Sequence, residues 1–522
     1  MIYSAKHFLD KRQTGHLRRF VNETIKRWQV PGVAIGVVSD NETVLAEGFG
    51  IRGLKCKSPV SAETLFAIAS CTKAFTSLAV AIAVEEGKIS WDTPVREYLP
   101  EFRLSDPCAS ERITPKDLLT HASGLPRHDD VWWKCNDTRE EYVHKLRFLE
   151  PSKDLRSKYQ YQNLMYMVAG YLVGKVYGTT WEAFLQSRLL DPLKMTATNF
   201  SIADSRKSDD YAFPHVTIKN KTRSTDFYDI LEGVGPAGSM NSNVTDMLKW
   251  LSFHLNKGLI DGQQIVPEAC VLKTHTPQIV CEPSGFKAMP YLTYAMGWHA
   301  TQYRGFRLLF HGGNVGGFSC NTAFLPDENV GIVVLTNLSS SSVGKIVTYH
   351  LCDLLLLGNQ TSNKTVSSKS THRKGARIAD TSAGTGLLEM KPLPWNDLYQ
   401  EQVDKERAEA KKKQQQQRRN RVKGTKPSHS LAEFVGNYRN QAYGSMRVTL
   451  QKGSLYCEYQ EKVLPLVHYH YDVFERVDAS YGSRTLVAFH TRTNGHIGNL
   501  SIRLEPEVSE IIFERVRDGS PV

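Results

Sequence analysis

The stretch FAIASCTKAFTS, residues 66–77, decides how this sequence folds and which chemistry it carries. It opens an apolar helix that we expect over Thr72 to Glu86, closed by Gly87. Ser70 and Lys73 stand three residues apart, so their side chains share one face of the helix start. A helix N-terminus favours negative charge on the serine oxygen, and a partly buried lysine beside it can lose its proton. The pattern therefore predicts an activated serine.

The segments on either side of this stretch predict a mixed fold. Two strands are expected within Val30 to Gly53, because apolar residues alternate on both sides of a polar turn. Helices and then strands are expected further along: helices over Leu164 to Tyr177, Thr180 to Leu190 and Thr245 to Leu255 (with Thr245 as its cap), then strands over Phe306 to His311, Ser319 to Leu325 and Gly331 to Asn337. This order predicts an α/β (α+β) core with a helical subdomain.

The composition changes after residue 358, which predicts three parts: a first domain over 1–358, a flexible and basic linker with a charged helical stretch over 359–428, and a small β-rich domain over 429–522. The linker begins with a stretch rich in Ser, Thr, Lys and Gly. The last part returns to short alternating segments, which are typical of a small sandwich or barrel.

Two further motifs carry polar groups suited to acyl chemistry. In Tyr161-Gln162-Asn163, the phenol can move a proton if a nearby cation lowers its pKa, and the amide can orient a carbonyl group or Lys73. In the motif His311-Gly312-Gly313-Asn314, small residues leave room for a substrate backbone along the strand. The backbone N–H of its asparagine and that of Ser70 could together form an oxyanion hole.

Together these motifs resemble the class C serine β-lactamases, the low-molecular-weight penicillin-binding proteins, and their esterase and D-aminopeptidase relatives. The resemblance covers about residues 17–355 and includes the segments Asp92 to Val95, Thr120 to Leu125 and Gly235 to Met240. It implies an antiparallel sheet flanked by helices, with a helical subdomain. The small C-terminal β domain is similar to an extension found in many members.

The resemblance also implies roles for individual residues. The catalytic set would be Ser70 as the acylated nucleophile, Lys73 as its base and Tyr161 as the proton shuttle. The substrate-binding set would be Asn163, His311, Gly313 and Asn314. His311 stands where many members carry lysine, and Gln162 and Gly312 also depart from the usual residues. Loss of that permanent cation argues against high affinity for carboxylate-bearing β-lactams.

We therefore expect a serine acyl hydrolase that cleaves an amide or ester carbonyl in a small molecule or peptide, without a metal or organic cofactor. His468 and His470 begin a metal-binding pattern, but Val473 stands where it needs its last histidine, so we interpret them as surface residues. The alternative is a secreted extracellular or shell-matrix structural protein that keeps the fold with little or no turnover, as in mollusc members of the family. The sequence does not fix the oligomeric state.

The net charge of +11 comes mainly from one segment. Lys405 to Lys426 holds ten basic and two acidic residues, a local charge of +8, so the other 500 residues carry only +3. No aromatic residue interleaves this run, which argues against a nucleic-acid platform. The longest apolar runs are about half of the ~18–20 residues that a membrane span needs.

Asparagine usage points to the secretory pathway. Ten of the 21 asparagines begin Asn-x-Ser/Thr sequons: Asn22, Asn41, Asn136, Asn199, Asn220, Asn243, Asn337, Asn359, Asn363 and Asn499. The N-terminus shows no apolar signal segment, so a cytoplasmic location is the alternative. The nine cysteines lack a metal-binding spacing and are interpreted as buried thiols, although Cys270 and Cys281 are close enough to pair in a secreted protein.

Overall fold

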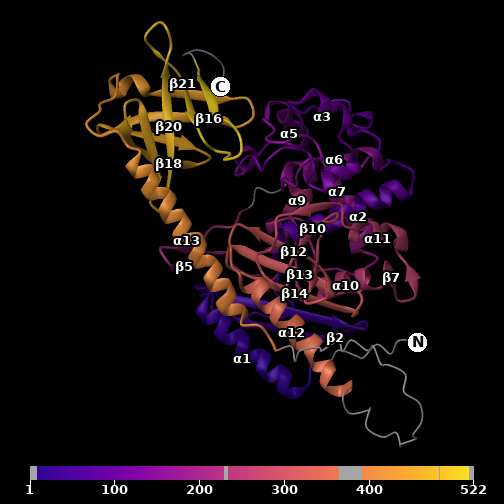
Figure 1. The fold of residues 1–522 in the computed structure, drawn as a ribbon. Coiled ribbons are helices and arrows are strands. Elements are labelled where there is room, and N and C mark those ends of the chain that lie inside the picture. The colour runs from indigo at the N-terminus through magenta and orange to yellow at the C-terminus, as the bar shows by residue number, and fades with distance from the viewer. Residues whose placement is uncertain (1–8, 229–232, 364–390, 481, 517–522) are drawn as a thin grey trace, which may run out of the picture.

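An eight-stranded antiparallel sheet forms the centre of the computed structural model, which describes residues 9–228, 233–363, 391–480 and 482–516 (Figure 1). Its order is β2-β1-β14-β13-β12-β11-β10-β9. The strands are β1 (Gly32–Ser39), β2 (Glu42–Gly50), β9 (Ile279–Cys281), β10 (Leu292–Tyr294), β11 (His299–Tyr303), β12 (Phe306–Val315), β13 (Phe318–Leu325) and β14 (Val330–Thr336). Every residue of β1, β13 and β14 is buried because both faces of the sheet are covered.

Helices cover both faces of this sheet. The helices α1 (Lys11–Arg27) and α12 (Val343–Asn363) pack below it in Figure 1. On the other face lies α10 (Val244–Leu255), with α2 (Thr72–Glu85) beyond it. The predicted cap of α10 was wrong: the Asn243 side chain accepts from the Asp246 N–H, while the hydroxyl of Thr245 bonds the Glu63 carboxylate.

Above the sheet, helices and turns form the predicted helical subdomain, and α6 packs against α2. Its helices are α3 (Pro107–Arg112), α4 (Pro115–Leu119), α5 (Arg139–Lys145), α6 (Asn163–Tyr177), α7 (Trp181–Leu185), α8 (Ile202–Ser205) and α9 (Gly235–Gly238). The remaining body elements are α11 (Glu268–His275) and three two-stranded ribbons, β3 (Phe66–Ala67) with β6 (Asn241–Ser242), β4 (His215–Ile218) with β5 (Lys221–Ser224), and β7 (Leu259–Ile260) with β8 (Gln263–Gln264). The expected α/β class is therefore confirmed.

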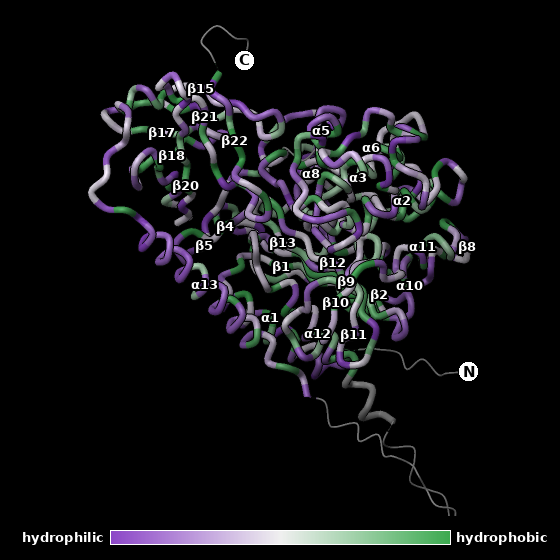
Figure 2. The backbone as a smooth tube through the Cα atoms, turned by 45° about the horizontal axis from the view of Figure 1, so that its top comes forward, coloured by the Kyte–Doolittle hydropathy of each residue, from purple (hydrophilic) through white to green (hydrophobic). Residues whose placement is uncertain are grey.

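Two helices connect the body to the C-terminal part. Helix α12 continues to Asn363, past the boundary expected at residue 358, and residues 364–390 of the predicted linker lie outside the described residues. The next helix, α13 (Trp395–Arg419), begins with two buried aromatic residues, and the indole N–H of Trp395 donates to Asp353 at 3.0 Å. From residue 404 onward α13 is almost entirely exposed and hydrophilic (Figure 2), so its charge lies in solvent.

The C-terminal part is a closed eight-stranded antiparallel barrel, the second of the two predicted forms. Each strand pairs with the next, and β15 closes the barrel against β22. The strands are β15 (Gly436–Asn440), β16 (Gly444–Gln451), β17 (Ser454–Tyr459), β18 (Lys462–His470), β19 (Val473–Asp478), β20 (Ser483–Thr491), β21 (Ile497–Ile502) and β22 (Ile511–Arg515). Phe434, Phe474 and Phe489 meet inside it in edge-to-face contacts.

The structure bears on the expected state of the cysteines and on the expected glycosylation sites. All nine cysteines are free thiols, Cys270 and Cys281 included. Two of the ten sequon asparagines, Asn243 and Asn337, are buried and use their side chains in hydrogen bonds, so neither can carry a glycan in the folded chain. None of the described helices combines the length and apolar character that crossing a bilayer requires.

Candidate active site

Ser70 lies on a short 3-10 turn, Ala69–Cys71, directly before α2. Ala69 has a φ of 46°, a left-handed conformation that is uncommon outside glycine and typical of functional sites. The turn packs against β12 at Gly313, where a Cβ atom would lie 2.3 Å from the carbonyl oxygen of Ile68. Glycine at this position therefore allows the strand to approach the serine, whatever part it also has in binding.

Lys73 is fully buried one helical turn further on. Its Nζ lies 3.2 Å from Ser70 Oγ, 2.8 Å from Asn163 Oδ1 and 2.7 Å from the Ala237 carbonyl oxygen. Burial, and then the positive charge of Arg127, hold the pKa of Lys73 well below its usual value. A neutral amine has two N–H groups and one lone pair, so the two carbonyl acceptors can use both donors and leave the lone pair for the serine hydroxyl.

Asn163 is the first residue of α6, and Gln162 caps that helix by accepting from the Leu164 N–H at 2.9 Å. The Gln162 amide also donates to the Pro126 carbonyl, which ties the following loop to the helix. The amide nitrogen of Asn163 donates to Asp129 at 3.1 Å. Because a carboxylate accepts only, this contact turns the amide oxygen of Asn163 toward Lys73.

Tyr161 lies between the amine of Lys73 and the guanidinium of Arg127. The ring centroid is 4.7 Å from Lys73 Nζ and 5.1 Å from the Arg127 guanidinium carbon. Burial nevertheless raises the pKa of Tyr161, and a hydrogen bond with Ser70 and the charge of Arg127 only partly oppose it. The nearby cation thus lowers this pKa as expected from the sequence, but burial outweighs it, so the group is a neutral phenol. His121 packs on its ring at 4.3 Å and accepts from the Gln162 N–H.

Two of the three site residues that were not found from the sequence lie on one turn. Arg127 lines the cleft beside Ser70, and Asp129 joins it in an ion pair at 2.6 Å. Asp129 also accepts from Asn163 and from the Trp132 indole at 3.1 Å. The available signal was a charged cluster directly after the Thr120 to Leu125 motif.

On the β12 side of the cleft, both ring nitrogens of His311 have partners within the protein. Its Nδ1 donates to the Gly312 carbonyl at 2.8 Å, which leaves Nε2 to accept from the Tyr294 hydroxyl at 3.1 Å. Burial, and then the nearby His299, hold the pKa of His311 well below its usual value, so it adds no charge. The Asn314 side chain turns outward and accepts from the Ser340 N–H at 2.6 Å.

Helix α12 contributes a cation, Lys345, to the β12 side of the cleft. Lys345, in the first turn of α12, lines the cleft of about 460 Å³ that also contains Ser70 and Tyr161. Its Cε lies 3.8 Å from where a Cβ on Gly312 would be, so the lysine stem passes beside the glycine. Lys345 is exposed and takes part in none of the ion pairs found among the described residues.

Comparisons with protein families match both parts of the chain. The family model described as Beta-lactamase matches residues 17–351. A second model, described as a domain of unknown function (DUF3471), matches residues 420–515.

Individual relatives agree with these matches. Unguisins hydrolase ungD of Aspergillus violaceofuscus is 29% identical to this chain over the matched region. That region covers 65% of this chain and 64% of the length of the relative. The octameric penicillin-binding protein homologue from Pyrococcus abyssi is 21% identical with a TM-score of 0.61, covering 96% of this chain and 100% of its own. The D-amino acid amidase from Ochrobactrum anthropi SV3 is 20% identical with a TM-score of 0.56, covering 67% of this chain and 99% of its own. At these identities the two structures show a shared fold, which in the first case includes the barrel.

Proposed function

This chain belongs to the beta-lactamase family, and from that premise we propose that it is a hydrolase that cleaves an amide or ester through an acyl-enzyme on Ser70. The observation that carries the proposal is Lys73, buried, with its pKa depressed, and 3.2 Å from the Ser70 hydroxyl. A buried lysine without a carboxylate partner is an expensive arrangement that a purely structural core has no reason to keep.

Acylation begins when Ser70 Oγ attacks the carbonyl carbon and the neutral amine of Lys73 takes its proton. The phenol of Tyr161 then gives a proton to the leaving nitrogen or oxygen and recovers one from Lys73, so protons balance. This order suits Tyr161, because its raised pKa keeps the phenol protonated. Backbone N–H groups of Ser70 and Asn314 are the proposed donors to the oxyanion.

Deacylation needs a base for the attacking water. The neutral Lys73 suits that step better than Tyr161, whose high pKa makes it a poor proton acceptor at neutral pH. Water attacks the acyl carbon, its proton passes to Lys73, and Ser70 leaves with a proton returned from the lysine. No step in this scheme calls for a cofactor.

The proposal is tested with a fluorescent penicillin, a fluorophosphonate and a nitrophenyl ester. Covalent labelling and ester turnover should occur in the wild type and disappear in Ser70→Ala. Ser77→Ala is the matched control, because it removes another buried hydroxyl from α2, one that forms a hydrogen bond with Tyr166 rather than with Lys73 or Tyr161. Absence of Ser70-dependent labelling and of turnover would refute the enzyme, and would favour the structural protein that keeps the fold.

We also propose that the chain enters the secretory pathway. Four sequon asparagines, Asn22, Asn41, Asn136 and Asn220, are exposed and can accept glycans. A glycosidase should increase the mobility of the native protein on a gel, and replacing these four by glutamine should reduce that shift. A native protein that a glycosidase leaves unchanged would place it in the cytoplasm instead.

A further inference from the structure

A short turn, residues 127–131, lies between the active site and the C-terminal barrel. On the site side, Arg127 lies over the ring of Tyr161 and Asp129 accepts from Asn163. Asn163 in turn contacts the base Lys73 at 2.8 Å. The position of this turn therefore fixes two charged groups beside the proposed proton-transfer residues.

On the other side, the barrel encloses His128, which is 1% exposed. The His128 N–H donates to Glu505 at 2.9 Å, and its Nδ1 lies 2.6 Å from the Tyr443 hydroxyl. Its Nε2 lies 2.9 Å from the carbonyl oxygen of Glu150, and must donate there because a carbonyl only accepts. Burial lowers the pKa of His128, so the ring is neutral and Nδ1 accepts from Tyr443.

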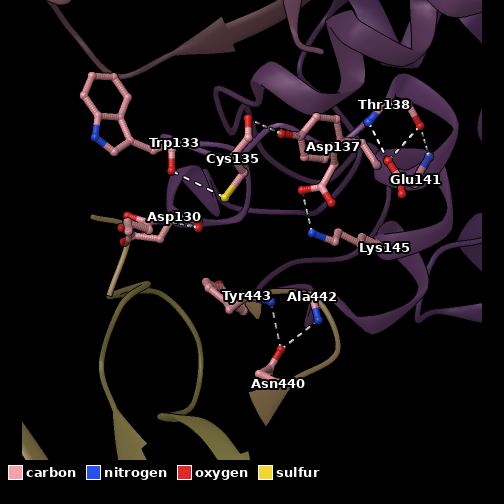
Figure 3. Close-up of polar contacts among 12 residues, drawn as sticks. Asp130, Trp133, Cys135, Asp137, Thr138, Glu141, Lys145, Asn440, Ala442 and Tyr443 are labelled. Carbon is pink, nitrogen blue, oxygen red and sulfur yellow. Dashed lines mark hydrogen bonds and ion pairs between the residues drawn. The ribbon is translucent and has the colours of Figure 1, made fainter. Parts of the chain in front are cut away.

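Neighbouring contacts extend this interface (Figure 3). The hydroxyl of Tyr459 donates to the Asp130 carbonyl at 3.2 Å. The barrel turn that presents Tyr443 is itself fixed, because the Asn440 side chain accepts from the N–H groups of Ala442 and Tyr443 at 2.8 and 3.0 Å. Figure 3 shows this turn facing the segment that contains Asp130 and Trp133.

The turn does not have a conformation that it would hold by itself. His128 has a φ of 46°, in the left-handed region, which costs a residue with a side chain roughly 1–2 kcal/mol. The body anchors the turn through Gln162, which holds the Pro126 carbonyl, and Glu150, which holds the His128 ring. The other two partners of His128 come from the barrel.

We propose that the barrel is a positioning element of the active site: Tyr443 and Glu505 hold His128, and thereby place Asp129 on Asn163 and Arg127 over Tyr161. The expected effect on the reaction rate rests on the proposed function. The contacts between the barrel and the turn are independent of that function. The C-terminal domain would then be needed for the geometry of the active site, unlike a domain that folds and functions independently of the body. His128, Tyr443 and Glu505 act through Asn163 and Lys73, so they are positioning residues.

The first test is structural and needs no substrate. In full-length protein, Tyr443→Phe and Glu505→Gln should increase hydrogen–deuterium exchange of peptides covering residues 127–133 roughly tenfold. Tyr438→Phe is the matched control, because that hydroxyl bonds the Phe434 carbonyl inside the barrel and lies away from His128. Unchanged exchange in both interface variants would overturn the proposal.

The second test separates positioning from stability. With the fluorescent penicillin, Tyr443→Phe should lower the limiting acylation rate about tenfold while the dissociation constant of the non-covalent complex changes less than twofold. Tyr438→Phe should leave that rate unchanged even where it lowers the melting temperature. A loss of rate that follows melting temperature in all variants would identify a merely structural role.

A double mutant completes the argument. His128→Asn keeps a residue that tolerates the left-handed conformation but removes the ring that Tyr443 holds. Adding Tyr443→Phe to His128→Asn should cause no further loss of rate and no further exchange, because the first change has already removed the ring that the Tyr443 hydroxyl bonds. Additive losses would overturn the proposal. The proposed function is tested separately, by comparing labelling of the wild type with that of Ser70→Ala. The hydrogen–deuterium exchange test of the barrel contacts gives its answer whether or not labelling occurs.

Discussion

The two walls of the cleft are built on different principles. The inner wall, formed by the Ser70 turn, α2 and the start of α6, is buried, and Lys73, Asn163 and Asp129 bind one another or backbone carbonyls. The outer wall, formed by the end of β12 and the start of α12, leaves Asn314 and Lys345 exposed. Groups that are buried and paired with the protein can act in the same way on any carbonyl, whereas exposed groups are available to recognise a particular substrate.

Inner-wall changes should therefore harm every substrate equally, and Lys73→Met should harm them most. Removing the base should lower acylation at least ~10³-fold for penicillin and nitrophenyl ester alike. A second signature follows from its depressed pKa: the unfolded chain binds a proton that the folded chain releases, so wild-type unfolding free energy rises with pH between the folded pKa and the ordinary value of 10.5.

Denaturant titrations at pH 7 and pH 9 measure this slope, which the methionine variant should lack because it has no amine. Equal slopes in the two proteins, or acylation that survives in the variant, would show that Lys73 is an ordinary protonated lysine.

Gly313→Ala tests the close contact between β12 of the outer wall and the Ser70 turn of the inner wall. Its Cβ would lie 2.3 Å from the Ile68 carbonyl oxygen and 2.5 Å from Cys320 Sγ, so the Ser70 turn would have to move away from β12. We expect an acylation rate about 10²-fold lower, because the attacking oxygen and the oxyanion donors separate. In Gly312→Ala the new Cβ meets no atom closer than 3.8 Å, so that variant should remain within severalfold of wild type.

Probe labelling rates measure both variants. If Gly313→Ala labels as fast as Gly312→Ala, the close approach of the strand is not what places the serine.

The sequence predicted residues of both walls where they lie in short motifs, and missed others. Ser70, Lys73, Tyr161 and Asn163 lie in short contiguous motifs, whose spacing predicts which side chains can meet before any tertiary contact is known. Lys345 comes from a helix that reaches the cleft only through folding, and no local pattern marks it. Asp129 was marked only by the charged cluster after the Thr120 to Leu125 motif, which does not show that its carboxylate meets Asn163.

Other differences arise from burial, which local sequence does not show. The sign of the Tyr161 pKa depends on desolvation that only the packed structure provides. Likewise, Asn243 and Asn337 match the glycosylation pattern but are used as a helix cap and as a bridge between backbone segments. Alternating strands predicted the C-terminal β domain, but the pairing of β15 with β22 that closes it joins residues far apart in sequence.

Behind the inner wall, Asp130 should make stability depend on pH. Burial and the neighbouring charge of Asp129 raise the pKa of Asp130 to about 6, and Glu505 adds to this while Arg476 and Lys462 oppose it. Because the folded pKa exceeds the unfolded value of 3.8, the fold is penalised above pH 6 and relieved below pH 4.

Asp130→Asn should therefore be more stable than wild type at pH 7.5, by an amount on the order of 3 kcal/mol, with the gain shrinking to zero near pH 4. Denaturant unfolding of both proteins across this range gives the difference. A gain that does not change with pH would mean that the carboxyl is ionised without cost.

The smallest effect should come from the outer wall, and it should be selective. Lys345→Met removes an exposed cation beside Gly312, so it should raise KM about 5–10-fold for a substrate with a carboxylate near the scissile bond, which matches the ~1 kcal/mol of an exposed charge pair. A neutral nitrophenyl ester should change less than twofold, because it has no anion for the lysine to bind. Lys257→Met, which breaks an exposed ion pair with Glu268 outside the cleft, controls for net charge. Equal losses for both substrates would place Lys345 with the inner wall and erase the distinction between the two.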